Sequence, residues 1–368
     1  MTRYVTVTPK AAQLCDLGYR IANRAQRRSA ARGGVHAAPM FTRSHSPWPA
    51  LAAAVAVLAG CGTKGGPPPP PQVALVASSA GFGDGGFNDD ARAALEACKQ
   101  QTIVVTASAA PSGNAEIEPK LILYATEKFD TVIAIGYAAA PAVAAVARRF
   151  DGTHFALIDA VASAPNIQSI TFNEAQGAFL AGALAALVSK THRIAFIGGA
   201  DVPLLRRSEA GFRAGARAAD PRAHVAIRYL GTFADAARGA AAARGLLAAG
   251  SDVVYVVAGP AGLGAIRAIA GSPHGYAIGA DTDEDAIAPG RVLASVTKHV
   301  GTAAGIVCSE TTGGKPEIGH RVLGIAEGGI GLTPFTYTKA VIGAATIARL
   351  HALARAVVDG RIAVPAQP

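Results

Sequence analysis

Charged residues are scarce in this chain of 368 residues: Asp, Glu, Lys and Arg make up 16% of it, against 51% hydrophobic residues. A disordered chain has the opposite balance, because it cannot bury enough apolar surface to offset the entropy lost on folding. The composition therefore excludes disorder. At roughly 100–200 residues per domain, the length predicts about two domains with sizeable cores.

Catalytic and metal-binding motifs are also missing. The chain has four cysteines and nine histidines, and neither set shows metal-ligand spacing. No G-x-S-x-G elbow or H-E-x-x-H motif occurs. The glycines between Gly259 and Gly264 lack the spacing of a dinucleotide-binding loop, and the segment Gly313-Gly314-Lys315 lacks that of a P-loop. We therefore expect no metal, no cofactor and no enzymatic activity.

Acidic residues are nearly absent from the first 60 positions, where Asp16 is the single acid against eight Lys and Arg residues. This stretch carries +7 of the formal charge of +9, so the other 308 residues carry only +2. A body that binds nucleic acid would carry the basic residues itself. We therefore expect no nucleic-acid partner, and the basic leader needs its own explanation.

A short apolar run, Trp48–Gly60, ends directly before Cys61. It holds no charge and is shorter than the ~20 residues of a membrane-spanning helix, which is typical of a secretory signal. Its end, LAGC, resembles the bacterial lipobox, in which the Cys thiol receives diacylglycerol. We expect residues 40–60 to be a lipoprotein signal peptide and Cys61 to carry a lipid that anchors the exported protein to a bacterial membrane, in the cell envelope or periplasm.

The segments on either side of this signal have different characters. Residues 61–72 form a Pro-rich tether, because five consecutive prolines, Pro67–Pro71, make a stiff extended spacer. These prolines cannot continue a helix, which argues against interpreting the apolar run as a buried helix. We interpret residues 1–39 as an N-terminal extension, either an over-extended start or a functional segment in which Arg27-Arg28 act as a twin-arginine export signal.

From Val73 onward, short apolar runs rich in β-branched residues alternate with longer Ala-rich segments. This alternation predicts an α/β fold with parallel sheets covered by helices on both faces. Ten strands are too many for one such sheet, so two doubly wound lobes fit better, with the long helix 173–190 passing between them. The predicted strands are 73–78, 102–107, 131–135, 154–159, 167–172, 193–197, 224–230, 252–257, 276–279 and 292–297; the predicted helices are 88–100, 137–150, 173–190, 204–219, 234–249 and 261–270.

Polar residues and glycine follow several predicted strands. In doubly wound sheets, ligands bind beyond the carboxyl ends of the strands. Asp and Gly are also common turn residues, so each position alone has a structural explanation. Strand-end residues from both halves together make a stronger case for a binding site: Ser78, Ser79, Asp159, Gly259, Asp281 and Lys298.

Segments spread over residues 73–365 together resemble the basic membrane lipoprotein family of bacterial solute-binding proteins, which includes purine nucleoside receptors. The matching segments are 83–89, 155–159, 166–174, 179–182, 197–199, 211–215, 231–235, 278–283, 295–298, 328–332 and 359–365. Two positions depart from the family pattern. Ser78-Ser79 stand where many relatives carry Asp, and Glu284 stands where many carry Gln.

The resemblance implies a type I periplasmic-binding-protein fold, with two lobes joined by a three-crossover hinge. The lobes would comprise residues 73–175, then 176–290, with residues 291–368 returning to the first lobe and ending in a C-terminal helix. The protein would act as a monomer that captures a small molecule in the cleft and delivers it to an ABC permease. The resemblance favours a neutral nucleoside, preferably a purine nucleoside. We do not expect a nucleotide, because Asp159 and Asp281 would place carboxylates on the cleft walls, with Lys298 as the only cation assigned there.

The resemblance also implies roles for individual residues. Asn88 and Asp159 would bond the base, Phe233 and Phe87 would stack on it, and the ribose would be held by Gly259, Asp281 and Lys298. Carboxylates accept hydrogen bonds from hydroxyls, and an aromatic face stacks on any base. For Phe87 the alternative is a core aromatic residue that anchors the first helix, whereas for Phe233 we favour the site.

Two cysteines remain in the body, Cys98 and Cys308. In an exported protein they could pair, or they could be isolated buried thiols. In the fold that the resemblance implies, the helix after Lys298 returns to the lobe that holds Cys98, which favours a disulfide.

Two other classes of function remain open from the sequence. An enzyme could use the same doubly wound lobes, but the absence of a nucleophile with its base, or of a cofactor loop, argues against it. A sensory or structural lipoprotein of the same fold could bind another small polar ligand such as a sugar, and the sequence separates this class poorly from a transport receptor.

Overall fold

The computed structural model describes residues 69–78, 81–83, 86–98, 103–107 (backbone only) and 116–365, which all belong to one compact unit, Pro68–Pro368. The expected signal peptide, the lipid attachment at Cys61 and the strand-end residue Ser79 lie outside these ranges. None of the helices in these ranges is both long enough and apolar enough to cross a bilayer.

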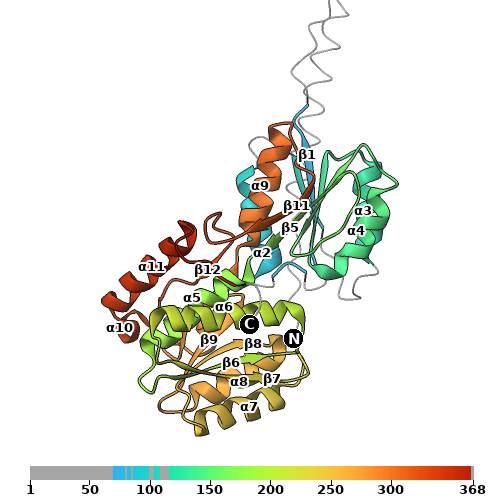
Figure 1. Ribbon diagram of the computed structural model, residues 1–368. Coiled ribbons are helices and arrows are strands. Elements are labelled where there is room, and N and C mark those ends of the chain that lie inside the picture. Colours follow the sequence, from blue (N-terminus) through green and yellow to red (C-terminus); the bar gives the residue numbers. More distant parts are fainter. Residues whose placement is uncertain (1–68, 79–80, 84–85, 99–102, 108–115, 366–368) are drawn as a thin grey trace, which may run out of the picture. The chain divides into compact units, whose positions relative to one another are not determined.

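The first lobe is built on a sheet of six parallel strands, in the order β11-β5-β4-β3-β1-β2 (Figure 1). Both faces are covered, since Val73 and Leu75 of β1 pack into one buried cluster and Ala74 and Val76 into another. Helices α2 and α9 lie on the first face, and α3 and α4 on the second. The elements are β1 (Gln72–Val76), α2 (Phe87–Cys98), β2 (Ile103–Ala107), α3 (Ile117–Thr126), β3 (Thr131–Ile135), the 3-10 turn η2 (Tyr137–Ala139), α4 (Ala140–Ala147), β4 (His154–Ile158), β5 (Ile167–Phe172), α9 (Val300–Thr312) and β11 (Gly319–Leu323).

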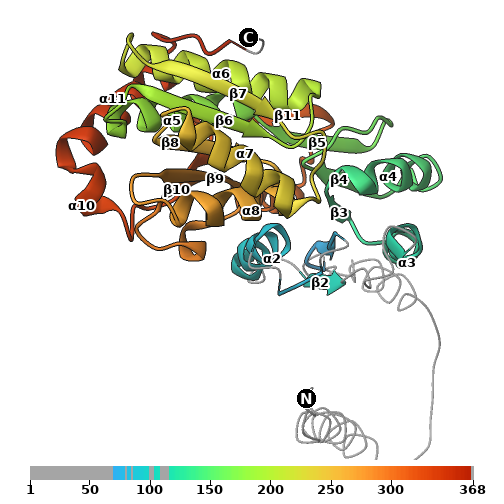
Figure 2. The same ribbon diagram turned by 90° about the horizontal axis from the view of Figure 1, so that it is seen from below.

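The second lobe has the same plan, with the strand order β12-β10-β9-β8-β6-β7. Its strands are parallel except β12, which runs antiparallel to β10. Helices α5 and α6 cover one face, and α7 and α8 cover the other (Figure 2). The elements are α5 (Glu174–Val188), β6 (Arg193–Gly198), α6 (Pro203–Ala219), β7 (His224–Tyr229), α7 (Ala236–Ala248), β8 (Val253–Val257), α8 (Gly259–Ala270), β9 (Tyr276–Asp281), η3 (Asp285–Ile287), β10 (Val292–Lys298), β12 (Ile330–Leu332), α10 (Lys339–Ile342) and α11 (Ala344–Val358).

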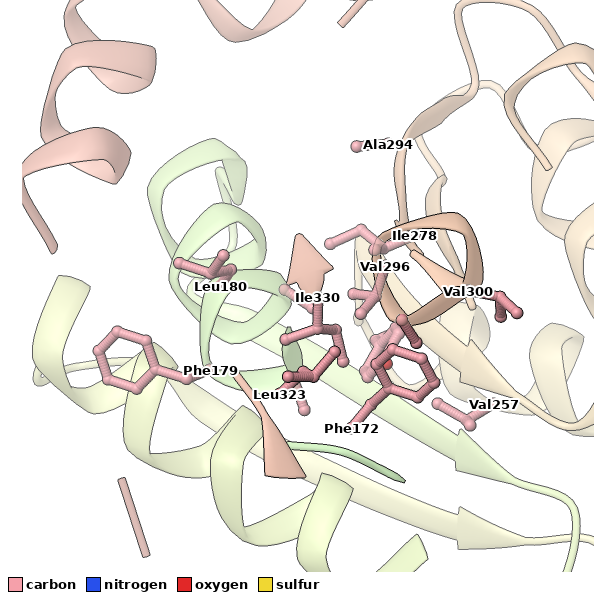
Figure 3. Close-up of a cluster of buried hydrophobic side chains, with 14 of the residues drawn as sticks. Phe172, Phe179, Leu180, Val257, Ile278, Ala294, Val296, Val300, Leu323 and Ile330 are labelled. Carbon is pink, nitrogen blue, oxygen red and sulfur yellow. The ribbon is translucent and has the colours of Figure 1, made fainter. Parts of the chain in front are cut away.

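The described chain passes between the two sheets three times, after β5, after β10 and after β11. These crossovers are bonded to one another: the Asn173 N–H donates to the Leu323 carbonyl at 2.9 Å, and the His299 N–H donates to the Gly329 carbonyl at 2.8 Å. Apolar side chains from all three crossovers share one buried cluster, of which Figure 3 shows Phe172, Leu323 and Ile330. The hinge is therefore a small packed core.

The structure corrects the expected point of return to the first lobe. We expected residues 291–368 to lie there, but β10 pairs with β9 in the second sheet, so the chain returns only after Lys298. The chain then leaves again, because β12 pairs with β10 and α11 packs against α5. The reason is that β10 is buried along Val292–Val296 and needs a neighbour on each edge.

A disulfide joins the end of α2 to α9. The Cα atoms of Cys98 and Cys308 lie 6.6 Å apart, although the two residues are separated by 210 positions in the sequence. The same two helices are also linked near their other ends, where the Gly301 N–H donates to Asp90 Oδ2 at 2.6 Å. The disulfide therefore fixes the returning segment to the first helix of its lobe.

Candidate functional site

The two sheets direct their carboxyl ends to a common region. In the first sheet, β2 lies on one side of β1 and β3 lies on the other side, so the strand order reverses at β1. In the second sheet, β7 and β8 lie in the same way on the two sides of β6. Ligands bind at such switch points in doubly wound sheets. The residues that follow these strands and their neighbours are therefore the candidates for a ligand site.

Three carboxylates from both lobes surround Lys298, the last residue of β10. Its Nζ lies 3.0 Å from Asp159 Oδ1, which follows β4 of the first lobe. The same Nζ lies 3.6 Å from Asp281 Oδ1 at the end of β9 and 3.8 Å from Glu174 Oε1 at the start of α5. Only 9% of the Lys298 side chain is exposed, against 49% for Asp281, so the lysine is enclosed and the Asp281 carboxylate is open to a ligand.

Electrostatics keep this lysine charged. Burial alone would lower the pKa of Lys298, but the charges of Asp281, Asp159 and Glu174 raise it above its ordinary value. Burial raises the pKa of Asp159 and of Glu174, and the nearby lysine opposes that change. Three carboxylates therefore share one ammonium group, and the cluster carries a net negative charge when all are ionised.

The two aspartates have an unusual backbone conformation. Asp159 has φ 65° and Asp281 has φ 68°, in the left-handed region that L-residues other than Asn and Asp rarely adopt. Residues held in such conformations cluster at ligand-binding positions. The same left-handed conformation occurs at the end of a central strand in each lobe, β4 in the first and β9 in the second. Each lobe therefore contributes one aspartate carboxylate to the cluster.

An exposed aromatic ring lies beside the charged cluster. Phe233 precedes α7 and is 44% exposed. Its ring packs against the backbone of Gly199, where a Cβ would collide with the ring, and close to Gly259, which has φ 52°. The Phe233 carbonyl accepts a hydrogen bond from the Ala261 N–H at 2.8 Å, which holds this loop on the start of α8. The glycines therefore make room for a ring that stays partly exposed.

A cavity of about 140 Å³ is lined by Glu174, Phe233, Gly259, Asp281 and Lys298, but not by Asp159. Its walls also include Tyr255 of β8 and apolar residues of α6 and β12. A second hollow of about 190 Å³ shares Asp281 and Lys298 and extends to Phe87. A larger hollow of about 540 Å³ lies between α5 and α11, with a largely apolar lining and none of these residues. The charged and aromatic groups place the candidate site in the first two, despite their smaller size.

Most of the predicted site residues come together here. Asp159, Asp281 and Lys298 are in contact, and Phe233 and Gly259 form a wall of the adjoining cavity. The ring of Phe87 packs on the core and also faces Lys298, whose Nζ lies 5.9 Å from the ring centroid. Phe87 therefore anchors α2 and borders the second hollow, whereas its stacking on a base stays a prediction.

Asn88 lies in a different setting. Its side chain is fully buried, and Oδ1 accepts from the Ser78 N–H at 2.8 Å. Its Nδ2 donates to Ser78 Oγ and to the Gly81 carbonyl, both at 2.9 Å. The amide thus holds the loop after β1, and a direct contact between Asn88 and a base stays a prediction.

Two residues of the site were not singled out from the sequence. Glu174 begins a helix, whereas the pattern that indicated a site consists of residues at strand ends. Its position directly after a crossover strand is the signal that could have found it. Tyr255 lies inside an apolar strand, VVYVV, and its pattern is that of a core residue. Only the structure shows that it reaches the cavity.

Comparison with known proteins gives matches over most of the chain. The family model described as ABC transporter substrate-binding protein PnrA-like matches residues 71–367. The ABC transporter nucleoside-binding protein BmpA of Lactococcus lactis subsp. cremoris is 29% identical over 343 residues, which cover 86% of this chain and 96% of that protein. Basic membrane protein A1 of Borrelia garinii subsp. bavariensis is 30% identical over 274 residues, which cover 71% of this chain and 81% of that protein.

The fold is shared with solved solute-binding proteins. An ABC transporter solute-binding protein from Conexibacter woesei has a TM-score of 0.68 at 25% identity, covering 80% of this chain and 98% of that one. The predicted fold, two doubly wound lobes of the type I periplasmic-binding-protein class, is confirmed.

Proposed function

The chain belongs to the PnrA-like family of ABC transporter substrate-binding proteins, and from this premise we propose that it captures a nucleoside, with a purine preferred, between its two lobes. Proteins of this class bind a small molecule outside the cytoplasm and pass it to an ABC permease. The relative from Lactococcus lactis is named as nucleoside-binding, which supports the proposed ligand class.

The observation that carries the proposal is the lysine with its three carboxylates, next to the partly exposed ring of Phe233. Asp281 and Lys298 can accept from and donate to the hydroxyls of a ribose. Phe233 can stack on a base, which is worth roughly 1–3 kcal/mol. We assign Asp159 to the polar edge of the base; its contact with Lys298 also links the two lobes.

The charge of the cluster favours a neutral ligand. A nucleotide would bring a phosphate dianion to a site where Asp159, Glu174 and Asp281 outnumber Lys298. Repulsion between like charges is strong in partly buried sites because solvent screens it poorly. We therefore propose that nucleoside monophosphates bind far more weakly than nucleosides.

Titration calorimetry on the purified protein tests the proposal. A purine nucleoside should bind, and Asp281→Ala should weaken it about tenfold to a hundredfold, since a hydrogen bond to a charged group contributes about 1.5–3 kcal/mol. The affinity for the free base should fall less in this variant, because the base has no ribose to contact Asp281. Asp151→Ala is the matched control, since Asp151 is exposed and precedes the amino end of β4 in the first sheet, whereas the candidate site lies at the carboxyl ends of the strands.

Three results would contradict the proposal. Tight binding of a nucleoside monophosphate would show that the charge argument is wrong. An unchanged nucleoside affinity in Asp281→Ala would place the ligand elsewhere. Binding of a sugar without any binding of nucleosides would favour the alternative, a lipoprotein of this fold with another small polar ligand.

A further inference from the structure

Tyr255 is a buried tyrosine that forms part of the floor of the cavity beside Lys298. It lies in the middle of β8, and only 2% of it is exposed. Its ring is fixed on two sides, by Phe196 at 5.7 Å in an edge contact and by Phe212 at 5.6 Å in a stacked contact. The ring therefore has little freedom to turn its hydroxyl away from its present position.

The Tyr255 hydroxyl makes no hydrogen bond with any residue that the structure describes. Buried tyrosine hydroxyls normally have a partner, and Tyr229 on the neighbouring surface of the same lobe follows that rule by donating to Glu209 Oε2 at 2.7 Å. Within the described ranges, Gln168 Oε1 is the one fully enclosed side-chain nitrogen or oxygen atom without a hydrogen-bond partner. The Tyr255 hydroxyl is thus not fully enclosed, and the surface onto which it opens is the cavity.

The cavity gives this hydroxyl a defined chemistry. Glu174, Asp281 and Lys298 line the same space. Burial raises the pKa of Tyr255 well above its ordinary value, and the negative charges of Asp281 and Glu174 raise it further. The group therefore keeps its proton and can donate a hydrogen bond at any pH at which the protein functions.

We infer that the Tyr255 hydroxyl binds the ligand directly, by donating a hydrogen bond to a hydroxyl of its sugar. The inference rests on the proposed nucleoside-binding function and extends it to a residue inside the core. A sugar hydroxyl suits the position, since it can accept from Tyr255 and donate to one of the carboxylates that line the cavity. Tyr255 would then help to distinguish nucleosides from free bases and deoxy analogues.

Replacement of the hydroxyl alone tests this role. Tyr255→Phe keeps the ring and its contacts with Phe196 and Phe212, so we expect the melting temperature without ligand to stay the same or rise, because an unpaired buried hydroxyl is removed. The nucleoside affinity should fall about two- to tenfold, the range for one neutral hydrogen bond. Tyr229→Phe is the matched control: it loses the bond to Glu209, so its melting temperature should fall while its affinity stays unchanged.

A set of nucleosides that each lack one sugar hydroxyl identifies the partner. The analogue that lacks the hydroxyl bonded by Tyr255 should bind wild type and Tyr255→Phe equally, whereas the other analogues should still bind the variant more weakly. If Tyr255→Phe lowers the affinity for every analogue by the same factor, the assignment of the hydrogen bond to the sugar is wrong.

The outcomes separate the two proposals. If wild type binds nucleosides and Tyr255→Phe binds them equally well, the inference is wrong and the proposed function stands. The inference is also wrong if the affinity loss comes with a fall in melting temperature as large as that of Tyr229→Phe, since the hydroxyl then acts on the fold. If wild type binds no nucleoside, both proposals fail.

Discussion

Glu284 and Asp285 are neighbouring acids with different surroundings. Asp285 is buried and accepts from Ser295 Oγ and Thr333 Oγ1, both at 2.7 Å, so it ties the turn after β9 to the strands of its lobe. Glu284 accepts from the Ala280 N–H at 3.1 Å. Burial raises the pKa of Glu284 to about 7, with the charges of Asp281 and Asp285 adding to the effect and the Ala280 N–H opposing it.

This raised pKa predicts a change of stability with pH. Glu284 ionises near 4.5 in the unfolded chain and near 7 in the folded one, so the folded protein binds the additional proton between these values. Its contribution to the free energy of unfolding therefore falls as pH rises from about 4.5 to about 7, and is lowest above that range.

Glu284→Gln should remove this dependence, because the amide does not ionise and its oxygen can still accept from the Ala280 N–H. We expect the variant to melt at a higher temperature than wild type above pH 7, with the difference shrinking toward pH 4.5. Melting curves for both proteins across this range measure it. If the melting temperatures of the two proteins differ by the same amount at every pH, Glu284 does not titrate as its surroundings indicate.

At the scale of residues, the sequence predicts those parts of the site that follow from topology. Asp159, Asp281 and Lys298 end strands, and parallel strands of a doubly wound sheet bring their ends together. Tyr255 does not follow from such reasoning, since nothing in an apolar strand shows which side chain faces a cavity. The contact between Lys298 and Asp159 also depends on how two lobes are placed, which periodicity does not determine.

Helices α5 and α6 pack with almost no space between their backbones. Gly211 and Gly215 of α6 face the carbonyls of Ala175 and Phe179 on α5, and a Cβ at either glycine would collide with that backbone. Backbone cannot move aside as a flexible side chain can, so the small residues are a condition of the packing.

Gly215→Ala should therefore destabilise the second lobe by about 1–3 kcal/mol, the usual cost of overpacking. Gly245→Ala in α7 is the matched control, because Gly245 is exposed and a Cβ there would meet no atom within 4 Å. The free energy of unfolding of this control should rise by about 0.5–1 kcal/mol, since Ala is a better helix former than Gly. Denaturant unfolding of the two variants compares them, and equal stabilities would contradict the close-packing argument.

The disulfide between α2 and α9 acts on the same scale. A crosslink between residues 210 positions apart restricts the unfolded chain strongly. We expect its loss to lower the free energy of unfolding by about 2–4 kcal/mol. Calorimetry with and without reductant should show this for wild type.

The double variant Cys98→Ser, Cys308→Ser provides the control. It should melt near the temperature of reduced wild type, and reductant should not change that temperature. A wild-type protein that melts at the same temperature in both conditions would show that the two thiols are not joined in the purified protein.

At the scale of elements, hydrophobic periodicity finds the central strands and the edge strands β2 and β7, but it misses the edge strands β11 and β12. Strand β11 reads GHRVL and is mostly exposed, and β12 has three residues, so neither has an apolar pattern of its own. Both are formed by pairing, β11 with β5 and β12 with β10. The expected boundary at residue 291 was wrong for the same reason, because only the pairing of β10 with β9 shows to which sheet it belongs.

For the whole molecule, the remaining proposal from the sequence is its attachment to a membrane. The apolar run ending in LAGC and the prolines that follow predict a lipid on Cys61. Intact-mass analysis of protein extracted from membranes should show a lipid adduct on a chain that begins at Cys61. Cys61→Ser should release the protein from the membrane fraction, and an unmodified chain that retains Met1 would contradict the proposal.

The link between Cys98 and Cys308 also makes the covalent chain a closed ring with two tails. The ring contains every strand from β2 to β10, whereas β11, β12, α10 and α11 belong to the outgoing tail. A single proteolytic cut in the exposed turn at Arg222 would therefore open the ring without releasing a fragment, and the pieces would separate on a gel only after reduction. A cut within the exposed segment 316–320, in the tail, would release its fragment under either condition.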